Sequence, residues 1–472
     1  MTNLISEMQK KSLLDCNLAK DNMYKIEPVH IKNYEFIAST RARKEALDVL
    51  IAGVESVLPR TIFKNITYKD GFLKIFKHRH QLSGKKIYVI GAGKACGRMA
   101  YEIERILSPK RIAGGIVNSV EKVPTKRIQV RACSFPLPNN YSLNGVKKML
   151  RLTKDVGRND VVLCLISGGG SALMPYPADG ISLEEKRNVI EMMLKRGVRS
   201  FEFHHLRKHI SKVKGGQLAK LLQPSRVIGI ILSDVLDPRD DAPAAGPTYP
   251  DKSTYRNAFE VLKKYQMYKD VPKSVRDRVD SGVRGQIEET PKPGEKYFNN
   301  VYNYVLGDYK VALKAMFLKA KKLGYTTEIL ADPIIGEVKD ISEDMVAVLK
   351  DRIKKNQKPY ALIYCTESVV NMRKGGKGGR NQQMAGYLIK ELAKIPNMVY
   401  AAIDTDGRDY IKGVGGAIID SDTLNKAMKK KTNIDYFLNT YNTYELHRRL
   451  SSHILMENTG TNVGDIHVFL CR

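Results

Sequence analysis

With 472 residues, the chain is longer than one ordinary domain, so we expect two or three domains. Hydrophobic residues make up 43% of it, which is enough to form substantial cores. Lysine and arginine exceed the acidic residues by 29, but they are spread along the chain without an arginine-rich arm. This pattern favours solvated surface charge first, attraction of small anionic substrates second, and specific nucleic-acid binding last.

The sequence carries no sign of a disulfide framework or of a secretion or membrane signal. Its six cysteines are scattered without a CxxC pair, which argues against structural disulfides and against a zinc site. The residues before Met23 carry charges throughout, and no apolar run reaches membrane-spanning length. We therefore expect a soluble cytoplasmic protein that does not bind membranes.

The N-terminal part divides into a polar segment and a helix. Residues 1–35 are polar without a clear period, and we interpret them as an N-terminal extension. From Ala38 to Val57, apolar residues recur at helical spacing, and Pro59 ends this predicted helix.

The loop Gly91–Gly97 is the first candidate anion site. It follows the short apolar strand Ile87–Ile90 and precedes a predicted helix. Gly97 falls one residue late for the dinucleotide motif GxGxxG, and the loop is not a P-loop because no GK[ST] follows. A helix N-terminus still attracts anions, and Lys94 adds a full charge at the same place. A loop lysine that simply lies in solvent explains the pattern equally well.

A second candidate anion site follows the strand Val161–Ile166. This uninterrupted apolar run is typical of a strand that is buried on both faces. It ends in Ser167, Gly168, Gly169, Gly170 and Ser171. Glycine N–H groups can converge on an anion, and the two serines add hydroxyl donors. The alternative is a tight turn at the end of the strand, without a ligand.

Two aspartates follow the apolar strand Val227–Leu232. Asp234 and Asp237 lie just after it, where α/β proteins place ligand-binding groups. They are candidates for magnesium binding or for a general base, and capping of a turn is the alternative. The three histidines between residues 203 and 219 lack the glutamate of an HExxH motif, which disfavours a metal site there.

The second half of the chain begins after a linker at residues 286–299, where two prolines interrupt a polar stretch. We expect a first domain at residues 36–285 and a second at 300–472, which opens with a strand at 302–306. Within the second domain, a glycine-rich basic loop contains Arg380 and leads into a helix. Another apolar strand, Val399–Ile403, runs into the loop that contains Asp406. Because strands and helices alternate in both halves, we predict two α/β domains.

Eight short motifs, in this order, make the chain from about Ala38 onward resemble the type II glycerate kinases, also called the glycerate 2-kinase or MOFRL family. Each motif is weak alone, but eight in the family order are specific. They are Gly91–Ala95, Ser167–Ala172, Arg207–Ala219, Ser233–Val235, Gly246–Asp251, Gly378–Gln382, Thr405–Gly407 and Thr459–Val463.

The resemblance implies an N-terminal Rossmann-like sheet with helices on both faces and a smaller C-terminal MOFRL-type α/β domain. It implies ATP-dependent, magnesium-assisted phosphorylation of D-glycerate to 2-phosphoglycerate in the cleft between the domains. The family's essential lysine falls on Lys94 and its essential arginine on Arg380. If both act on one phosphoryl group, the two domains must come together there.

The site that we predict on this basis has three parts. The catalytic residues are Lys94, Arg380 and Asp234, and the metal ligands are Asp234 and Asp237. The residues assigned to cofactor binding are Gly91, Gly93, Ser167, Gly168, Gly169, Gly170, Ser171, Lys214, Gly215, Gly216 and Asp406. Which loop takes ATP and which takes glycerate stays open, as do the identity of the general base and the existence of a homodimer.

The chain departs from the family pattern at Phe135, His204, Leu236 and Ala245, which puts the substrate preference in question. The chemistry itself is not put in question, because the lysine, the arginine and the glycine-rich loops remain. Two functions from other classes of protein stay open as alternatives. One is an NAD(P)-dependent reductase that acts on hydroxypyruvate or another hydroxy acid. The other is a non-enzymatic protein that binds nucleotides or nucleic acids.

Overall fold

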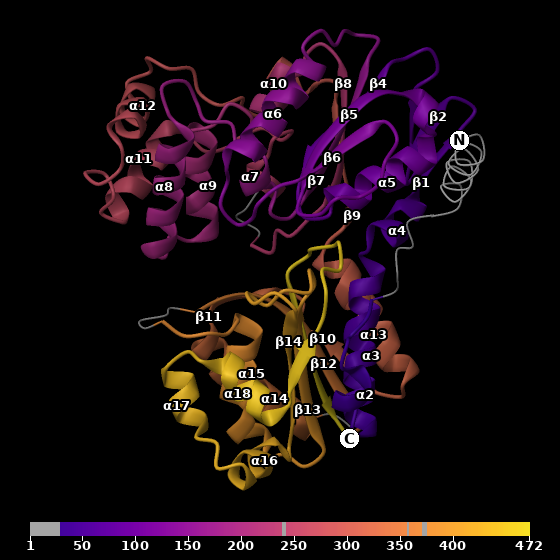
Figure 1. Cartoon of the computed structure of the whole chain (residues 1–472), viewed down its shortest axis with the longest axis vertical. Helices are drawn as coiled ribbons and strands as arrows, with labels where there is room; N and C mark the ends of the chain where they lie inside the picture. The colour runs from indigo at the N-terminus through magenta and orange to yellow at the C-terminus, as the bar shows by residue number, and fades with distance from the viewer. Residues whose placement is uncertain (1–28, 238–241, 356–357, 371–374) are drawn as a thin grey trace, which may run out of the picture.

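The computed structural model describes residues 29–237, 242–355, 358–370 and 375–472. In this part of the chain, two α/β domains lie one above the other, with the N-terminal domain at the top of Figure 1. Most of the predicted N-terminal extension lies outside the described residues. Its last residues are described: Ile31 forms a β-bridge with Met456, and helix α2 spans Tyr34–Ile37.

The N-terminal domain is built on a six-stranded sheet with the order β6-β5-β4-β7-β8-β9, in which all neighbouring strands are parallel. This is the strand order of the Rossmann fold. The chain adds β5 and β6 on one side of β4 and then β7, β8 and β9 on its other side, so the order of addition reverses between β4 and β7. Ligands bind such sheets at the carboxyl ends of the strands on either side of that reversal. The strands are β4 (Ile87–Ala92), β5 (Ile112–Ser119), β6 (Ile128–Ala132), β7 (Val161–Ser167), β8 (Arg226–Leu232) and β9 (Val301–Gly307).

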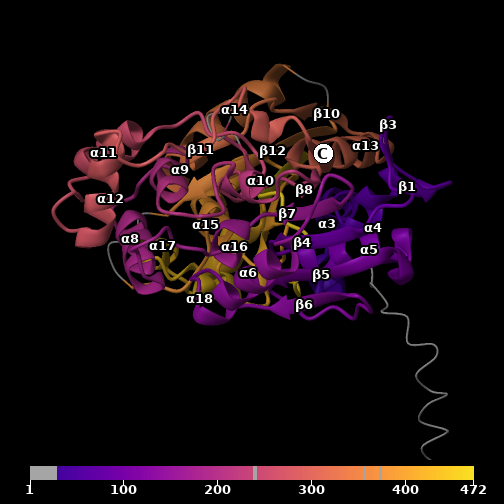
Figure 2. The same cartoon turned by 90° about the horizontal axis from the view of Figure 1, so that it is seen from above.

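Helices cover this sheet and extend to one side of it, as Figures 1 and 2 show. Strand β7 is buried along its whole length, as the apolar run in the sequence predicts. A small antiparallel sheet lies at the other side, made of β1 (Ile66–Lys69), β2 (Phe72–Ile75) and β3 (His78–Gln81). The helices are α5 (Cys96–Leu107), α6 (Asn140–Leu152), α7 (Gly170–Leu173), α8 (Leu183–Lys195), α9 (Ser200–His209), α10 (Gln217–Leu221), α11 (Tyr255–Lys264) and α12 (Lys273–Val283).

The C-terminal domain contains a mixed seven-stranded sheet with the order β10-β12-β16-β13-β14-β15, and β11 also pairs with β12. Alternate residues of its central strands pack into two different hydrophobic cores, one on each face of the sheet. Both faces of the sheet are therefore covered. The strands are β10 (Thr326–Ile329), β11 (Ile334–Glu337), β12 (Tyr360–Val369), β13 (Met398–Asp404), β14 (Val414–Asp420), β15 (His453–Leu455) and β16 (Asp465–Cys471). The helices of this domain are α13 (Tyr309–Lys322), α14 (Val338–Lys355), α15 (Arg380–Leu392), α16 (Thr423–Lys429), α17 (Ile434–Asn439) and α18 (Thr443–Leu450).

The helix predicted near the N-terminus exists as α3 (Arg41–Ser56), but it does not belong to the first domain. It packs on β13, β16 and α13 of the C-terminal domain, where Figure 1 shows it in indigo beside the orange strands. Its Gly53 allows this close approach, because a Cβ there would lie 2.8 Å from Met316 and 3.0 Å from Ile466. We predicted that the first domain begins at residue 36, but helical periodicity identifies only an apolar face and not the sheet that covers it.

The strand predicted at 302–306 is β9, and it belongs to the sheet of the N-terminal domain. It pairs with β8 in parallel and forms the edge of the N-terminal sheet, so the second domain does not open with it. The chain therefore passes between the domains twice, after α3 and after β9. One hydrophobic core extends from one face of the N-terminal sheet through α3 and α13 to the C-terminal sheet. Within the described residues, none of the helices has the length and apolar character needed to span a membrane.

Candidate active site

The loops after β4 and β7 meet at the reversal of strand order. The Lys94 amide donates to the carbonyl oxygen of Gly168 at 2.8 Å, and the Ala95 amide donates to the Ser167 hydroxyl at 3.0 Å. Gly169 has a φ of +75°, and a Cβ at this position would lie 3.1 Å from the Lys94 side chain and 3.0 Å from Phe135. The glycine therefore permits both the left-handed turn and the close packing of the lysine.

Lys94 reaches across the domain boundary. Its Nζ donates to Asp406 Oδ2 at 2.5 Å, and both side chains are largely buried. Burial opposes the charged form of the lysine, but the carboxylates of Asp406 and Asp404 raise the pKa of Lys94 above its ordinary value. The site therefore holds a protonated lysine at neutral pH.

Arg380 occupies the first position of α15 and lies between two aspartates. Its Nε and Nη2 both donate to the buried Asp465 carboxylate, and Nη2 also donates to Asp404 at 2.8 Å. Burial works against the charge, but Asp465 and Asp404 raise the pKa of Arg380 well above its ordinary value. Asp404 also accepts the Asp406 amide at 3.0 Å. The two cations predicted from sequence therefore lie in one ionic network that spans both domains.

The start of α15 is fixed by Asp409. This buried carboxylate accepts the backbone amides of Asn381 at 3.1 Å and Gln382 at 2.9 Å. A carboxylate at a helix N-terminus satisfies amides that the helix leaves unpaired. Burial and the charge of Asp465 raise the pKa of Asp409 to about 6.

Asp234 lies next to the glycine loop after β7. A Cβ on Gly168 would lie 2.5 Å from its carboxylate, and Asn462 Nδ2 donates to its Oδ2 at 3.3 Å. Burial raises the pKa of Asp234, against the opposing charge of Lys94. A carboxyl group with a raised pKa is a better proton acceptor than an ordinary aspartate.

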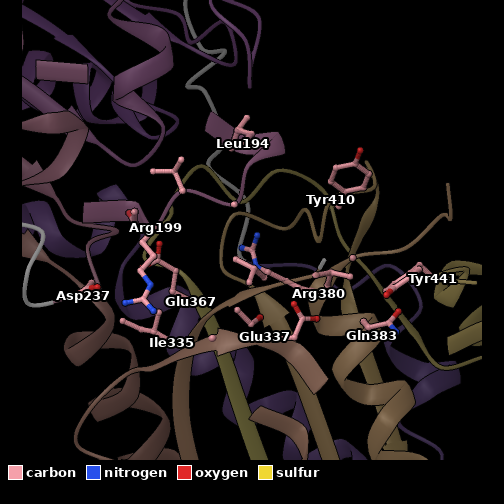
Figure 3. A pocket seen from close by; sticks show the side chains of 18 of the residues that line it. Leu194, Arg199, Asp237, Ile335, Glu337, Glu367, Arg380, Gln383, Tyr410 and Tyr441 are labelled. Carbon is pink, nitrogen blue, oxygen red and sulfur yellow. The ribbon is translucent and has the colours of Figure 1, made fainter. Parts of the chain in front are cut away.

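Two adjoining cavities open onto these residues. The smaller, of about 300 Å³, is lined by Lys94, Gly169, Ser171, His204 and Asp234, among others. The larger, of about 840 Å³, is lined by Arg380, Asp237 and residues of both domains, and Figure 3 shows it. Leu194, Ser200 and Glu367 line both cavities.

Several residues expected to bind the cofactor make bonds or close contacts within the protein. Gly91 lies within β4, where a Cβ would lie 2.1 Å from the Leu165 carbonyl oxygen, and the Gly93 amide donates to Asn118. The Ser167 hydroxyl caps the turn before α5, as described above. The amides of Gly215 and Gly216 donate to the carbonyl oxygens of Ala245 and Gly246. Backbone bonding and strand packing already use these groups, so their assignment to cofactor binding stays a prediction.

Of the other predicted residues, Gly168 and Gly170 form the loop, but only their neighbours Gly169 and Ser171 line a cavity. Lys214 is buried and lines neither cavity. Asp406 holds Lys94. Asp234 and Asp237 border different cavities, so the structure does not place them around one common space.

Sequence reasoning missed Asp404, Asp409, Asp465 and Glu367. Three of them lie where the sequence could have indicated a site. Asp404 and Glu367 follow apolar runs, and Asp465 is the last residue of a polar loop that precedes an apolar run. No local pattern marks Asp409. Among the four departures from the family pattern, Phe135 and His204 line the smaller cavity, whereas Leu236 and Ala245 line neither.

The fold and the site together define a two-domain α/β protein with a Rossmann-like sheet and an ionic site at the domain boundary. Residues 45–280 match a family model described as a domain of unknown function, DUF4147, and residues 360–465 match the MOFRL family model. The chain is 34% identical to a glycerate 2-kinase from Pyrococcus horikoshii over 86% of this chain and 92% of that one. The chain belongs to the glycerate 2-kinase family and carries its MOFRL domain.

A solved structure supports the same assignment. The crystal structure of a glycerate kinase from Thermotoga maritima matches with a TM-score of 0.76 and 29% identity, over 91% of this chain and 99% of that one. Another relative, from Agrobacterium vitis, bears the name putative hydroxypyruvate reductase. It is 28% identical over 93% of this chain and 99% of its own length.

Proposed function

We propose that this protein transfers the γ-phosphoryl group of ATP to the 2-hydroxyl of D-glycerate and releases 2-phosphoglycerate and ADP. The observation that carries the proposal is the network in which Lys94 of one domain and Arg380 of the other share neighbouring aspartates beside two adjoining cavities. Phosphoryl transfer needs positioning and charge neutralisation more than covalent chemistry. The largely buried Lys94 and the partly exposed Arg380 supply the charge neutralisation. The names of the relatives supply the substrate.

The volumes of the two cavities support the assignment of each substrate to a different cavity. The volume of the larger cavity, about 840 Å³, suits a nucleotide, and its walls combine apolar residues such as Val198 and Val370 with Arg380. The smaller cavity, about 300 Å³, suits a three-carbon acid and contains Lys94. We therefore assign ATP to the larger cavity and glycerate to the smaller one. The γ-phosphate then lies where the two cavities adjoin, between Lys94 and Arg380.

In this arrangement, the 2-hydroxyl oxygen of glycerate attacks the γ-phosphorus as the bond to the bridging oxygen of ADP breaks. Asp234 accepts the hydroxyl proton, since it borders the smaller cavity and burial raises its pKa. Lys94 and Arg380 neutralise the charge of the transferring group. Asp406 and Asp404 keep the two cations protonated and in place until substrate binds.

Magnesium assistance belongs to this proposal as well. Within the described ranges, no three histidine, cysteine, aspartate or glutamate side chains form a metal-binding group. This fits an ion held mainly by phosphate oxygens and water with one or two carboxylates, as is usual for Mg²⁺ in kinases. Asp237, beside the larger cavity that we assign to ATP, is the carboxylate that would hold it, and Asp234 keeps its role as proton acceptor. Mg²⁺ would neutralise part of the phosphate charge.

A coupled assay tests the proposal. Purified protein, ATP, Mg²⁺ and D-glycerate should yield ADP, and enolase added directly should convert the product into phosphoenolpyruvate. A requirement for phosphoglycerate mutase before enolase would show that the 3-hydroxyl is phosphorylated instead. Absence of ADP formation above the rate without glycerate would overturn the proposal.

The name of the Agrobacterium relative makes a hydroxypyruvate reductase the second candidate. The glycine loop after β4 argues against it, since Gly97 is out of register for a dinucleotide motif and the Gly93 amide is already paired. Oxidation of NADH or NADPH by hydroxypyruvate, measured by absorbance with the same preparation, distinguishes the two functions.

A further inference from the structure

Two lysines lie buried behind the wall of the smaller cavity. Lys186 of α8 and Lys214, in the turn before α10, are each 1% exposed, and we call them the lysine pair. Lys186 lies one helical turn before Ile190, which lines the cavity. Lys214 donates to the carbonyl oxygen of Ala244, another residue of the cavity wall.

The lysine pair has little compensation for its charge. Lys186 donates to the Ile210 carbonyl oxygen at 3.0 Å, and Lys214 donates to the Ala244 carbonyl oxygen at 3.4 Å. An ammonium group has three donors, so one neutral acceptor leaves most of its hydrogen-bonding capacity unused. Within the part of the chain that the structure describes, no carboxylate is bonded to either lysine. Uncompensated buried cations are costly, and proteins usually keep them only beside a partner.

Lys208, a third buried lysine nearby, shows the usual solution. It is 3% exposed, and its Nζ donates to the buried Asp251 carboxylate at 3.0 Å. The lysine pair instead faces more positive charge. Burial, followed by the charge of Arg207, lowers the pKa of Lys186 to about 7, and burial together with Lys186 and Arg207 lowers the pKa of Lys214 well below its ordinary value. Arg207 itself lines the smaller cavity.

We propose that the lysine pair and Arg207 form the subsite that recognises the carboxylate of the acid substrate in the smaller cavity. This inference rests on the proposed function for the identity of that acid. Among the described residues no carboxylate is bonded to the lysine pair, and an anion that enters the cavity supplies negative charge that favours the protonated form of both lysines. Lys94 and Asp234 line the same cavity as Arg207, so a carboxylate held at this subsite fixes which hydroxyl faces the phosphate. Arg207 supplies the direct contact, and the lysine pair acts as a positioning and charge-supplying group behind it.

Steady-state kinetics of Lys186→Met and Lys214→Met test the proposal, because methionine keeps the length of the side chain and removes its charge. We expect KM for D-glycerate to rise about tenfold or more in each variant, while KM for ATP changes less than threefold. The preference for glycerate over glycerol, which has no carboxylate, should fall by a similar factor. Lys186→Arg and Lys214→Arg retain the charge and should lose less of that preference than the methionine variants.

Stability measurements separate this role from a structural one. Removal of an uncompensated buried charge should leave the melting temperature unchanged or raise it. Lys208→Met is the burial-matched control. It removes the cation paired with the buried Asp251, which keeps only the neutral donors Ser253 and Thr290, so it should lower the melting temperature and leave the ratio of the two KM values unchanged.

Three outcomes would overturn the inference. One is an unchanged KM for glycerate in both methionine variants with the fold retained. Another is a rise in KM for ATP alone, which would assign the charge to a nucleotide phosphate. If the wild-type protein does not phosphorylate glycerate, the proposed function fails first. Thermal shifts with D-glycerate, D-lactate and glycerol then test the lysine pair alone, and equal shifts of the wild type and the methionine variants would overturn it.

Discussion

The Lys94 ammonium of the N-terminal domain lies 2.5 Å from the Asp406 carboxylate of the C-terminal domain, and both groups are largely buried. The pair joins the two domains at the site where both contribute charge. It also means that Lys94 has a structural partner as well as a role in the proposed reaction. A variant of this lysine should therefore affect stability and turnover through separable causes.

Lys94→Met should lower kcat and kcat/KM together by roughly 10²–10⁴-fold, as expected for loss of a charge that acts on the transition state. It should also destabilise the fold by about 3 kcal/mol, because Asp406 stays buried without its partner. The double variant with Asp406→Asn should recover stability but not turnover. Urea unfolding and the coupled assay measure the two effects, and full turnover in Lys94→Met would contradict the assignment.

Arg380→Lys should lower kcat by about 10²–10³-fold although it keeps the positive charge. A lysine cannot replace the planar fork that contacts Asp465 through two nitrogen atoms. Arg472→Lys is the matched control, since Arg472 makes a similar two-nitrogen contact with Glu45 and lines neither cavity. It should lower the melting temperature slightly and change kcat less than twofold. Equal kinetic losses in the two variants would mean that Arg380 acts only through folding.

Gly169→Ala should reduce both stability and activity. Its φ of +75° costs an alanine about 1–2 kcal/mol, and the new Cβ would lie 3.1 Å from Lys94 and displace it. Gly180→Ala is the control, because Gly180 has a φ of +80° with nothing within 4 Å of the new Cβ. We expect similar shifts of the urea midpoint in both variants and at least a tenfold loss of kcat only in Gly169→Ala.

The stability of the C-terminal domain should fall as the pH drops from 6.5 to 4. Burial lowers the pKa values of His447 and His467 to about 4, and both side chains are fully buried. Below pH 6.5 the unfolded chain binds protons that the folded chain does not, so stability decreases with decreasing pH until the folded pKa is reached. Each histidine contributes up to about 3 kcal/mol to this loss. Urea unfolding of the wild type and of His447→Gln across this range measures the effect. The free energy of unfolding should depend less steeply on pH in the variant than in the wild type.

The sequence predicted much of the fold because local patterns report local structure. The uninterrupted apolar run of β7 and the helical spacing of α3 appear in the structure close to where they were predicted. The same patterns could not assign α3 or β9 to a domain. An apolar helix face or a short strand is satisfied equally well by either of two sheets, and only the packing of Gly53 against Met316 and the pairing of β9 with β8 decide between them.

The site, too, was predictable from the sequence only in part. By itself, the sequence determined the family, the two cations Lys94 and Arg380, and the glycine-rich loop after β7, because these depend on residue type and order along the chain. Only the tertiary structure decided which amides are already paired, which aspartates hold the cations, and that Lys186 and Lys214 both lie buried behind the wall of one cavity. Those properties depend on burial and on charges brought together from residues far apart in sequence, and electrostatic interactions become strong only where folding removes water from between them.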